Sequence, residues 1–258
     1  MDTDKKNPLK VKKILEANEA VAEVLDFVTL VGILLLSFSL IGLVGYPALR
    51  SNQEARYIEN TRLSFTVLAN NLNKVANGQA PSQSMELKMY GGRLSVRGDS
   101  TINITANNSA GQRVTILPTQ QMRTIENSID DNVVAYEGTG VWVKYPNGVI
   151  LTAYKPLVTN QSNVLVMPVV TITGISSSSG TGLSRITAKG LQSFDFQSNM
   201  SNIIVTINSS YIDGWKSFYN GTLSFDWNNC TASQCSAQLN KSNIDVYLIK
   251  TIMYTEVN

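Results

Sequence analysis

The 258-residue sequence has no histidine, only two cysteines and few charged residues. Without histidine it cannot form a Ser-His-Asp or Cys-His catalytic arrangement or a His-ligated zinc site, and it lacks the usual general base near neutral pH. Charged residues make up 16% of the chain and the net charge is +2, so we expect no nucleic-acid partner. These absences favour a protein that is not an enzyme. We predict no cofactor, metal or small-molecule substrate, although carboxylate, Lys or Tyr catalysis stays open.

One long apolar run stands out near the start. Phe27 to Tyr46, FVTLVGILLLSFSLIGLVGY, carries no charge, and as a helix at ~1.5 Å per residue it spans roughly the 30 Å of a bilayer core. The apolar core of a secretory signal peptide is shorter, and no small-residue cleavage site follows this run. A buried helix of a soluble protein would keep a polar face. We therefore predict a permanent transmembrane helix.

Flanking charges set the orientation. Three arginines follow the run (Arg50, Arg56, Arg62), whereas five lysines precede it (Lys5, Lys6, Lys10, Lys12, Lys13). The positive-inside rule then places the N-terminus in the cytoplasm and the rest outside. Glu23 and Asp26, at the inner end, are either ordinary interface residues or partners for the N-terminus of a neighbouring subunit.

The segment after the run predicts a second, amphipathic helix. Pro47 predicts a kink or short break, and Asn77-Gly78 predicts the C-terminal end. Five apolar residues recur at spacings of three, four and seven between these points: Ile58, Phe65, Leu68, Leu72 and Val75. This apolar stripe packs either on a β-sheet of the same chain or on equivalent helices of neighbouring subunits.

From residue 84 onward, short alternating segments separated by Gly, Asn, Asp and Ser predict half-buried strands. In VWVKYPNGVILTAY, Asn147-Gly148 predicts a hairpin with a type I′ turn. Pro168, inside an apolar run, predicts an edge or bulge position. Ser176 to Gly182, SSSSGTG, predicts a flexible loop.

Aromatic residues suggest two roles. Tyr211, Trp215, Phe218 and Tyr219 share one face of a short helix, which we expect to cap the sheet as part of the core. Sugar binding is the alternative. It requires an exposed aromatic groove, so complete burial of Trp142, Trp215 and Trp227 would leave it without support.

Cys230 and Cys235 enclose only four residues, and outside the cell such a pair forms a disulfide that closes a local loop. Sequons for N-glycosylation also concentrate in the later part of the chain, where each is a candidate acceptor if exported and exposed. The eight sequons start at Asn103, Asn107, Asn160, Asn199, Asn208, Asn220, Asn229 and Asn240.

Candidate catalytic carboxylates fall in no recognisable motif, so we name no catalytic residue: Asp130, Asp131, Asp195 and Asp226. A cleft that pairs two buried acids with shifted pKa values would revive the enzyme hypothesis.

Ala20-Val-Ala-Glu-Val-Leu-Asp-Phe resembles the start of archaeal type IV pilin-like proteins with a class III leader, and residues 20 to about 100 are similar to an uncharacterised archaeal membrane-anchored family with such N-termini. The resemblance implies cleavage between Ala20 and Val21, with the apolar helix kept as an anchor or filament core. Such leaders usually end in Gly, whereas this one ends Glu19-Ala20, so an intact single-pass protein stays open.

Together these observations predict an α+β protein: a long N-terminal helix, half transmembrane and half amphipathic, followed by a mostly antiparallel, β-rich extracellular domain. The expected segments are a basic leader or tail (1–22), the transmembrane helix (23–47), the amphipathic helix (48–78) and the β-rich ectodomain (79–258). The expected function is a non-enzymatic surface protein of the plasma membrane or an extracellular filament, with the lipid bilayer, like subunits and pilus assembly machinery as partners. The alternative is an anchored module that binds a glycan or a protein.

Overall fold

The computed structural model describes residues 8–174 and 176–258, with side chains from residue 21 onward. The chain divides into two compact units, Met1–Arg56 and Tyr57–Asn258, and each is described by itself. Of the predicted leader or tail, Lys5 and Lys6 lie outside the described residues, and nothing is described of the Lys10, Lys12 or Lys13 side chains.

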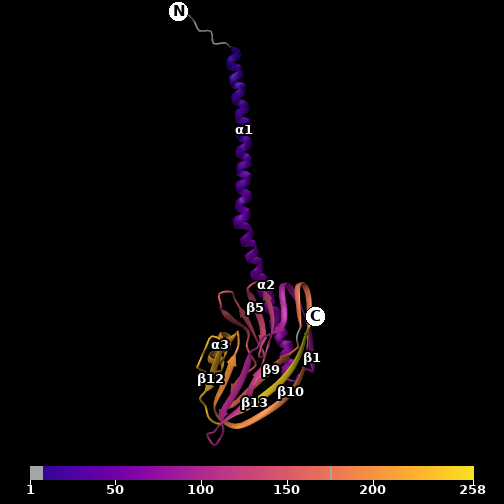
Figure 1. Ribbon diagram of the computed structural model, residues 1–258, viewed down its shortest axis with the longest axis vertical. Coiled ribbons are helices and arrows are strands. Elements are labelled where there is room, and N and C mark those ends of the chain that lie inside the picture. Colours follow the sequence, from indigo (N-terminus) through magenta and orange to yellow (C-terminus); the bar gives the residue numbers. More distant parts are fainter. Residues whose placement is uncertain (1–7, 175) are drawn as a thin grey trace, which may run out of the picture. The chain divides into compact units, whose positions relative to one another are not determined.

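Helical structure begins early and is continuous. Helix α1 spans Pro8–Leu40, the π-helical turn η1 spans Ile41–Gly45, and α2 spans Tyr46–Ala76 (Figure 1). Pro47 has no N–H to donate to the carbonyl of Leu43, and its ring crowds that carbonyl. The preceding turn is correspondingly wide, because the Tyr46 N–H bonds to the oxygen of Ile41, five residues back. The interruption predicted at Pro47 therefore takes the form of a π turn.

The second unit is built on a twisted, mostly antiparallel sheet, as predicted. Its path runs β7-β6-β5-β4-β1-β10-β13-β9-β8, in which only the β13–β9 pair is parallel. The strands of this path are β1 (Ser82–Arg97), β4 (Thr124–Ile129), β5 (Asn132–Glu137), β6 (Gly140–Lys144), β7 (Ile150–Tyr154), β8 (Thr159–Gln161), β9 (Val164–Thr173), β10 (Ser177–Asn208) and β13 (Ile244–Val257).

A second layer forms around the far end of β10. There β10 pairs with β2 and β12, which in turn pair with β3 and β11. Helix α3 packs against this layer. The bounds are β2 (Thr101–Asn107), β3 (Arg113–Gln121), α3 (Ile212–Leu223), β11 (Asp226–Asn228) and β12 (Gln234–Leu239).

Strand β10 corrects one prediction. It has 32 residues, of which Ile186 to Met200 pair with β13, as the orange and yellow strands of Figure 1 show. Ser177–Gly182, predicted as part of a flexible loop, is instead strand, because Ser177 to Ser179 pair with Ser95 to Arg93 of β1 and Gly182 pairs with Met89. Glycine and serine mark loops only when no neighbouring strand offers hydrogen bonds to their backbone.

The β6–β7 hairpin is present, but its turn is not type I′. The Gly148 N–H donates to the oxygen of Tyr145 at 2.9 Å, so Pro146 and Asn147 occupy the two central positions. Only Gly148 has a positive φ, of 82°, whereas a type I′ turn needs positive φ at both central residues. Proline fixes φ near −65°, and this favours a type I turn followed by a left-handed glycine.

Pro168 lies at an edge, as predicted. Strand β9 has β13 on one side along its length, whereas on the other side β8 pairs only with Val164 to Val166. The missing N–H of Pro168 therefore costs no ladder hydrogen bond to β8.

Two cores lie on opposite faces of the long sheet. Residues directly opposite each other in a ladder share a face, and neighbours along a strand alternate. On β13, the odd-numbered Met253 and Val257 pack in the core that contains α2. The even-numbered Val246 and Leu248 point to the other face and pack with α3 and the second layer.

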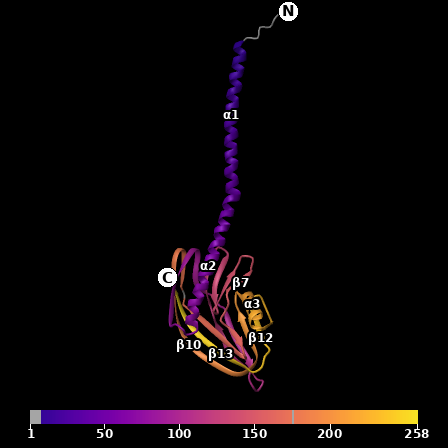
Figure 2. The same ribbon diagram turned by 180° about the vertical axis from the view of Figure 1, so that it is seen from behind.

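Helix α2 covers its half of the sheet with the predicted stripe, whose partner is the sheet of the same chain (Figure 2). Phe65, Leu68, Leu72 and Val75 are all at most 1% exposed. Burying each such side chain contributes roughly 1.5–3 kcal/mol. Gly78, with φ of 71°, follows the helix end as the sequence predicts.

Candidate functional site

The carboxylates considered in the sequence do not form a site. Asp130 and Asp131 lie exposed in the turn between β4 and β5, and Asp226 is exposed at the start of β11. Asp195, in the middle of β10, pairs with Lys250 of β13 at 3.3 Å. These four side chains therefore belong to separate parts of the β-rich unit.

Two other acids, which the sequence patterns did not single out, are buried. Glu137 ends β5 and is 1% exposed, and Glu126 in β4 is 5% exposed. The Glu137 Oε1 accepts hydrogen bonds from Ser209 Oγ at 2.6 Å and Trp215 Nε1 at 2.7 Å. The Tyr211 hydroxyl donates to Glu126 Oε1 at 2.8 Å. The pair thus ties α3 and the residues before it to the sheet.

Burial dominates the electrostatics of Glu137. It raises the pKa of Glu137 to about 7, against the lowering effect of the hydrogen bonds from Ser209 and Trp215, while the Glu126 charge raises it further. Burial also raises the pKa of Tyr211, and the neighbouring Glu126 charge adds to that rise. Arg97 pairs with Glu126 Oε2 at 2.5 Å.

The acid pair is enclosed by protein, which distinguishes it from the cleft that the enzyme hypothesis requires. The role that follows is structural, because the hydrogen bonds accepted by Oε1 of each acid link α3 and the residues before it to β4 and β5. Only the pattern of an acid within apolar strand residues, as in Ala135-Tyr136-Glu137, could have pointed to it from the sequence.

Tryptophans do not make the exposed groove predicted by the sugar-binding hypothesis. Trp142 and Trp215 are buried, with ring centroids 5.0 Å apart, and Tyr219 is fully buried beside Trp215. Trp227 is half-buried, and its Nε1 donates to the oxygen of Lys216 at 3.0 Å. The predicted helix and its core role are confirmed.

An exposed aromatic groove exists elsewhere, directly beyond the C-terminal end of α2. Gln192 and Thr251, which are paired across β10 and β13, donate to the last carbonyls of α2, Val75 at 2.6 Å and Ala76 at 2.7 Å. The next pairs on the same face are Phe194 with Ile249 and Phe196 with Tyr247. No helix among the described residues covers these pairs.

Aromatic exposure in the groove is large: 73% for Phe194, 48% for Phe196 and 43% for Tyr247. The Phe196 and Tyr247 rings lie 4.5 Å apart. With Val166 of β9 and Ile249 they line a groove of about 410 Å³ whose surface is almost entirely apolar. We call this the aromatic groove.

A second, polar hollow lies at the other side of the α2 C-terminus. Its volume is about 540 Å³. Amide side chains dominate its lining, which consists of Asn70, Asn73, Lys74, Asn77, Gln79, Tyr154 and Leu157. The Asn73 amide already has two partners within the protein: it accepts a hydrogen bond from the Tyr136 hydroxyl and donates one to the backbone oxygen of Thr139.

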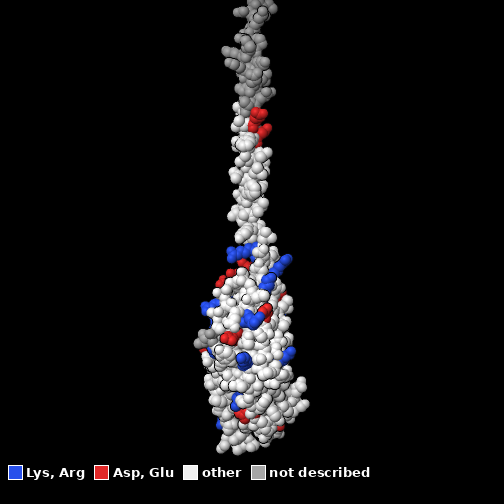
Figure 3. Space-filling model, turned by 90° about the vertical axis from the view of Figure 1, so that its right-hand side faces the viewer, with Lys and Arg blue, Asp and Glu red and all other residues white. Residues whose placement is uncertain are grey.

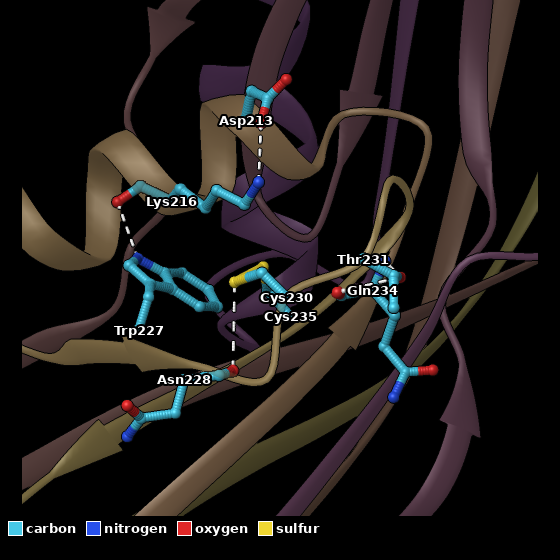
Figure 4. Close-up of polar contacts among 8 residues, drawn as sticks. All are labelled: Asp213, Lys216, Trp227, Asn228, Cys230, Thr231, Gln234 and Cys235. Carbon is cyan, nitrogen blue, oxygen red and sulfur yellow. Dashed lines mark hydrogen bonds and ion pairs between the residues drawn. A yellow bond between two sulfur atoms is a disulfide. The ribbon is translucent and has the colours of Figure 1, made fainter.

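The predicted disulfide is formed. Cys230 and Cys235 are bonded and close the loop between β11 and β12 (Figure 4). Within the loop Thr231 and Gln234 exchange hydrogen bonds, and beside it the Trp227 indole reaches Lys216, which pairs with Asp213 at 2.9 Å. The loop is thereby fixed against α3.

Sequon asparagines differ in accessibility. Asn103 and Asn160 are half-buried, and their amides donate to the backbone oxygens of Leu117 and Leu223. Asn107 is half-buried and accepts from Arg113. The remaining five are exposed: Asn199, Asn208, Asn220, Asn229 and Asn240.

The apolar run of the first unit is exposed on all sides. Among the described residues one helix is long and apolar enough to cross a membrane, and none of its most apolar stretch is buried. Leu36 is 66% exposed and Phe38 69%. Figure 3 shows this surface without charge between acidic atoms at one end and basic atoms at the other. Glu23 and Asp26 precede the run, and Arg50 follows it.

These features define a class of chain: an apolar helix exposed along its length, followed by a mostly antiparallel β-rich unit with one disulfide. Residues 19–251 match the model of a family of unknown function, DUF7289, and the chain belongs to that family. No curated protein and no solved structure matches the chain.

Proposed function

We propose that this protein is a non-enzymatic, single-pass membrane protein that displays its β-rich unit outside the cell. The observation that carries the proposal is the exposure of the apolar run on every side of α1. Leaving some twenty apolar residues in water is strongly unfavourable, whereas lipid removes them from water and an α-helix satisfies its own backbone. The disulfide supports an oxidising compartment for the β-rich unit.

The finer proposal is an archaeal pilin-like protein, either a filament subunit or a stand-alone anchored protein. Besides the N-terminal resemblance, a second exposed apolar patch supports contact between like subunits. It lies on the sheet face opposite the aromatic groove and contains Leu191, Ile252 and Tyr254, each at least 52% exposed. Patches of this kind mark interaction surfaces.

Extraction of the full-length protein from its native membrane tests the anchor. We expect it to stay in the membrane pellet after an alkaline carbonate wash. The double variant Leu36→Arg/Leu40→Arg places two charges inside the run, each costing roughly 2.5–3.5 kcal/mol at the bilayer centre, and should not be retained. The control variant Leu49→Arg/Leu63→Arg changes two exposed leucines outside the run and should be retained. Release of the unmodified protein by the wash would refute the proposal.

The identity of the first residue of the mature protein distinguishes a filament subunit from a stand-alone anchored protein. Mass spectrometry that finds Val21 as the first residue supports the pilin pathway, and an intact Met1 argues against it.

The alternative function is an anchored binding module, and the aromatic groove is the observation that favours it. A glycan or an apolar segment of a partner protein would stack on Phe194, Phe196 and Tyr247. Titration of candidate ligands against the full-length protein, followed by fluorescence or calorimetry, tests this alternative. Binding unaffected by Tyr247→Ser would exclude the groove as the site.

A further inference from the structure

The aromatic groove lies beside one of the five exposed sequons. Asn199 follows Phe196 by three residues on β10, a separation of about 10 Å along a strand. The ladder between β10 and β13 is irregular at this point. Gln197 pairs with Val246 and Met200 with Ile244, so two residues, Ser198 and Asn199, stand opposite the single residue Asp245.

This bulge places the Asn199 backbone beside Asp245, on the groove face of β13. The Asn199 backbone N–H donates to Asp245 Oδ1 at 3.0 Å. Asp245 is two residues from Tyr247, about 7 Å along β13, and the alternation of the strand puts both on the same face. Asn199 has φ of 56°, a left-handed conformation that asparagine tolerates better than most residues.

Two other sequons on the same sheet differ from Asn199 in their relation to the groove. Asn160 lies nearby on β8, but it pairs with Leu165, which packs in the core on the opposite face, and its amide bonds to Leu223. Asn208 lies at the far end of β10, paired with β2 and β12.

We propose that Asn199 carries an N-linked glycan whose first sugars lie in the aromatic groove and cover Phe196 and Tyr247. The glycan is transferred from a lipid-phosphate-linked oligosaccharide: the Asn199 Nδ2 bonds to the anomeric carbon and loses a proton as the carbon–oxygen bond to the lipid phosphate breaks and the phosphate leaves. The face of a pyranose ring that presents its C–H bonds is apolar and slightly positive, and it stacks on the electron-rich face of an aromatic ring. The glycan thereby removes from water an apolar surface that would otherwise promote association. The groove volume of about 410 Å³ falls in the range of roughly 300–1,000 Å³ typical of small-ligand clefts. The inference rests on the proposed function, because the sequon must leave the cytoplasm to be glycosylated.

Two variants of the sequon hydroxyl residue, Ser201, test the proposal without replacing Asn199. Ser201→Ala destroys the sequon, and Ser201→Thr preserves it as the matched control. The full-length protein is purified from its own membranes in detergent, and glycopeptide mass spectrometry determines the occupancy of Asn199. Hydroxyl-radical footprinting then compares the oxidation rates of Phe196 and Tyr247, with Tyr254 on the opposite face as the internal reference.

We expect Asn199 to be occupied in the unmodified protein and in Ser201→Thr. Oxidation of Phe196 and Tyr247 should rise several-fold in Ser201→Ala only, with Tyr254 unchanged. An unoccupied Asn199 in protein whose Cys230–Cys235 bond is intact overturns this inference and leaves the proposed function standing. Free thiols and no sugar at any sequon overturn both.

Occupancy with equal oxidation in all three proteins overturns the placement of the glycan in the groove. A further outcome is that the oxidation of Phe196 and Tyr247 falls as the protein concentration rises, in all three proteins alike. This would show that a second copy of the chain covers the groove, and it would also overturn the proposal.

Discussion

Replacing Glu137 by Gln should remove most of the pH dependence of stability between pH 5 and pH 8. Glu137 is buried, and its pKa is about 7 in the folded protein, compared with an ordinary value of 4.5. Histidine, the side chain that usually titrates in this interval, is absent from the sequence. The response of the unmodified protein in this window should therefore come mainly from one carboxyl group.

The sign follows from the raised pKa. The folded state holds the proton more tightly than the unfolded state, so the added stability is fully present below pH 4.5 and is lost as pH rises through about 7. At about 1.36 kcal/mol per pKa unit, the difference between the two values corresponds to on the order of 3 kcal/mol, most of it lost between pH 5 and pH 8. Gln cannot ionise, and its Oε1 can still accept from Ser209 and Trp215.

Urea unfolding of the full-length protein in detergent, followed by tryptophan fluorescence at pH 5, 6, 7 and 8, measures the effect. Trp215 bonds to Glu137, so its emission reports on the site. The unmodified protein should lose stability across this series, whereas Glu137→Gln should vary little. Asp130→Asn removes an exposed carboxylate at a positive-φ position that asparagine tolerates, and it should behave like the unmodified protein. Equal pH dependence in Glu137→Gln and the unmodified protein would refute the assignment.

Three further substitutions test the packing by the same unfolding measurement. Leu72→Ala should lower the free energy of unfolding by about 2–5 kcal/mol, because Leu72 is 1% exposed in the α2 core. Leu63→Ala changes a side chain that is 50% exposed on the same helix and should stay within about 0.5 kcal/mol. Similar losses of stability in the two variants would contradict the observed buried face of α2. Gly138→Ala should destabilise more than Gly111→Ala: both have positive φ, which costs about 1–2 kcal/mol, but only at Gly138 would the new Cβ lie 2.6 Å from the Trp215 ring. Equal effects would contradict that close approach. Replacing Cys230 and Cys235 by Ser should cost at most about 2 kcal/mol, because the closed loop is short, and a reductant should lower the unmodified protein to the same stability.

Local patterns in the sequence predict the elements that depend on near neighbours. The stripe from Ile58 to Val75, the aromatic helix around Trp215 and the β6–β7 hairpin all follow from spacings within a few residues. The type of the hairpin turn does not, because Pro146 competes with the Asn147-Gly148 pair and sets the φ of the first central position. Ser177–Gly182 was wrongly predicted for a similar reason, since the decisive partner, β1, lies some ninety residues away.

The aromatic groove and the buried Glu126–Glu137 pair could not be predicted from the alternation of apolar and polar residues along the strands. A strand pattern separates two faces, but it does not say where along the strand each face is covered. Gln192, Phe194 and Phe196 share one face of β10, and only the position of the α2 end decides that Gln192 bonds to a helix while the two phenylalanines stay exposed. Glu126 and Glu137 likewise become a buried pair through the approach of Tyr211 and Trp215, which the strand sequences do not encode.

The central claim is that α1 crosses a bilayer and that the chain beyond it faces the exterior. A cysteine at Ser51, exposed just after the apolar run, tests this most directly, because the two native cysteines are joined and do not react. Labelling of Ser51→Cys by a membrane-impermeant maleimide in intact cells is the predicted result. Labelling that occurs only after the cells are lysed would contradict it.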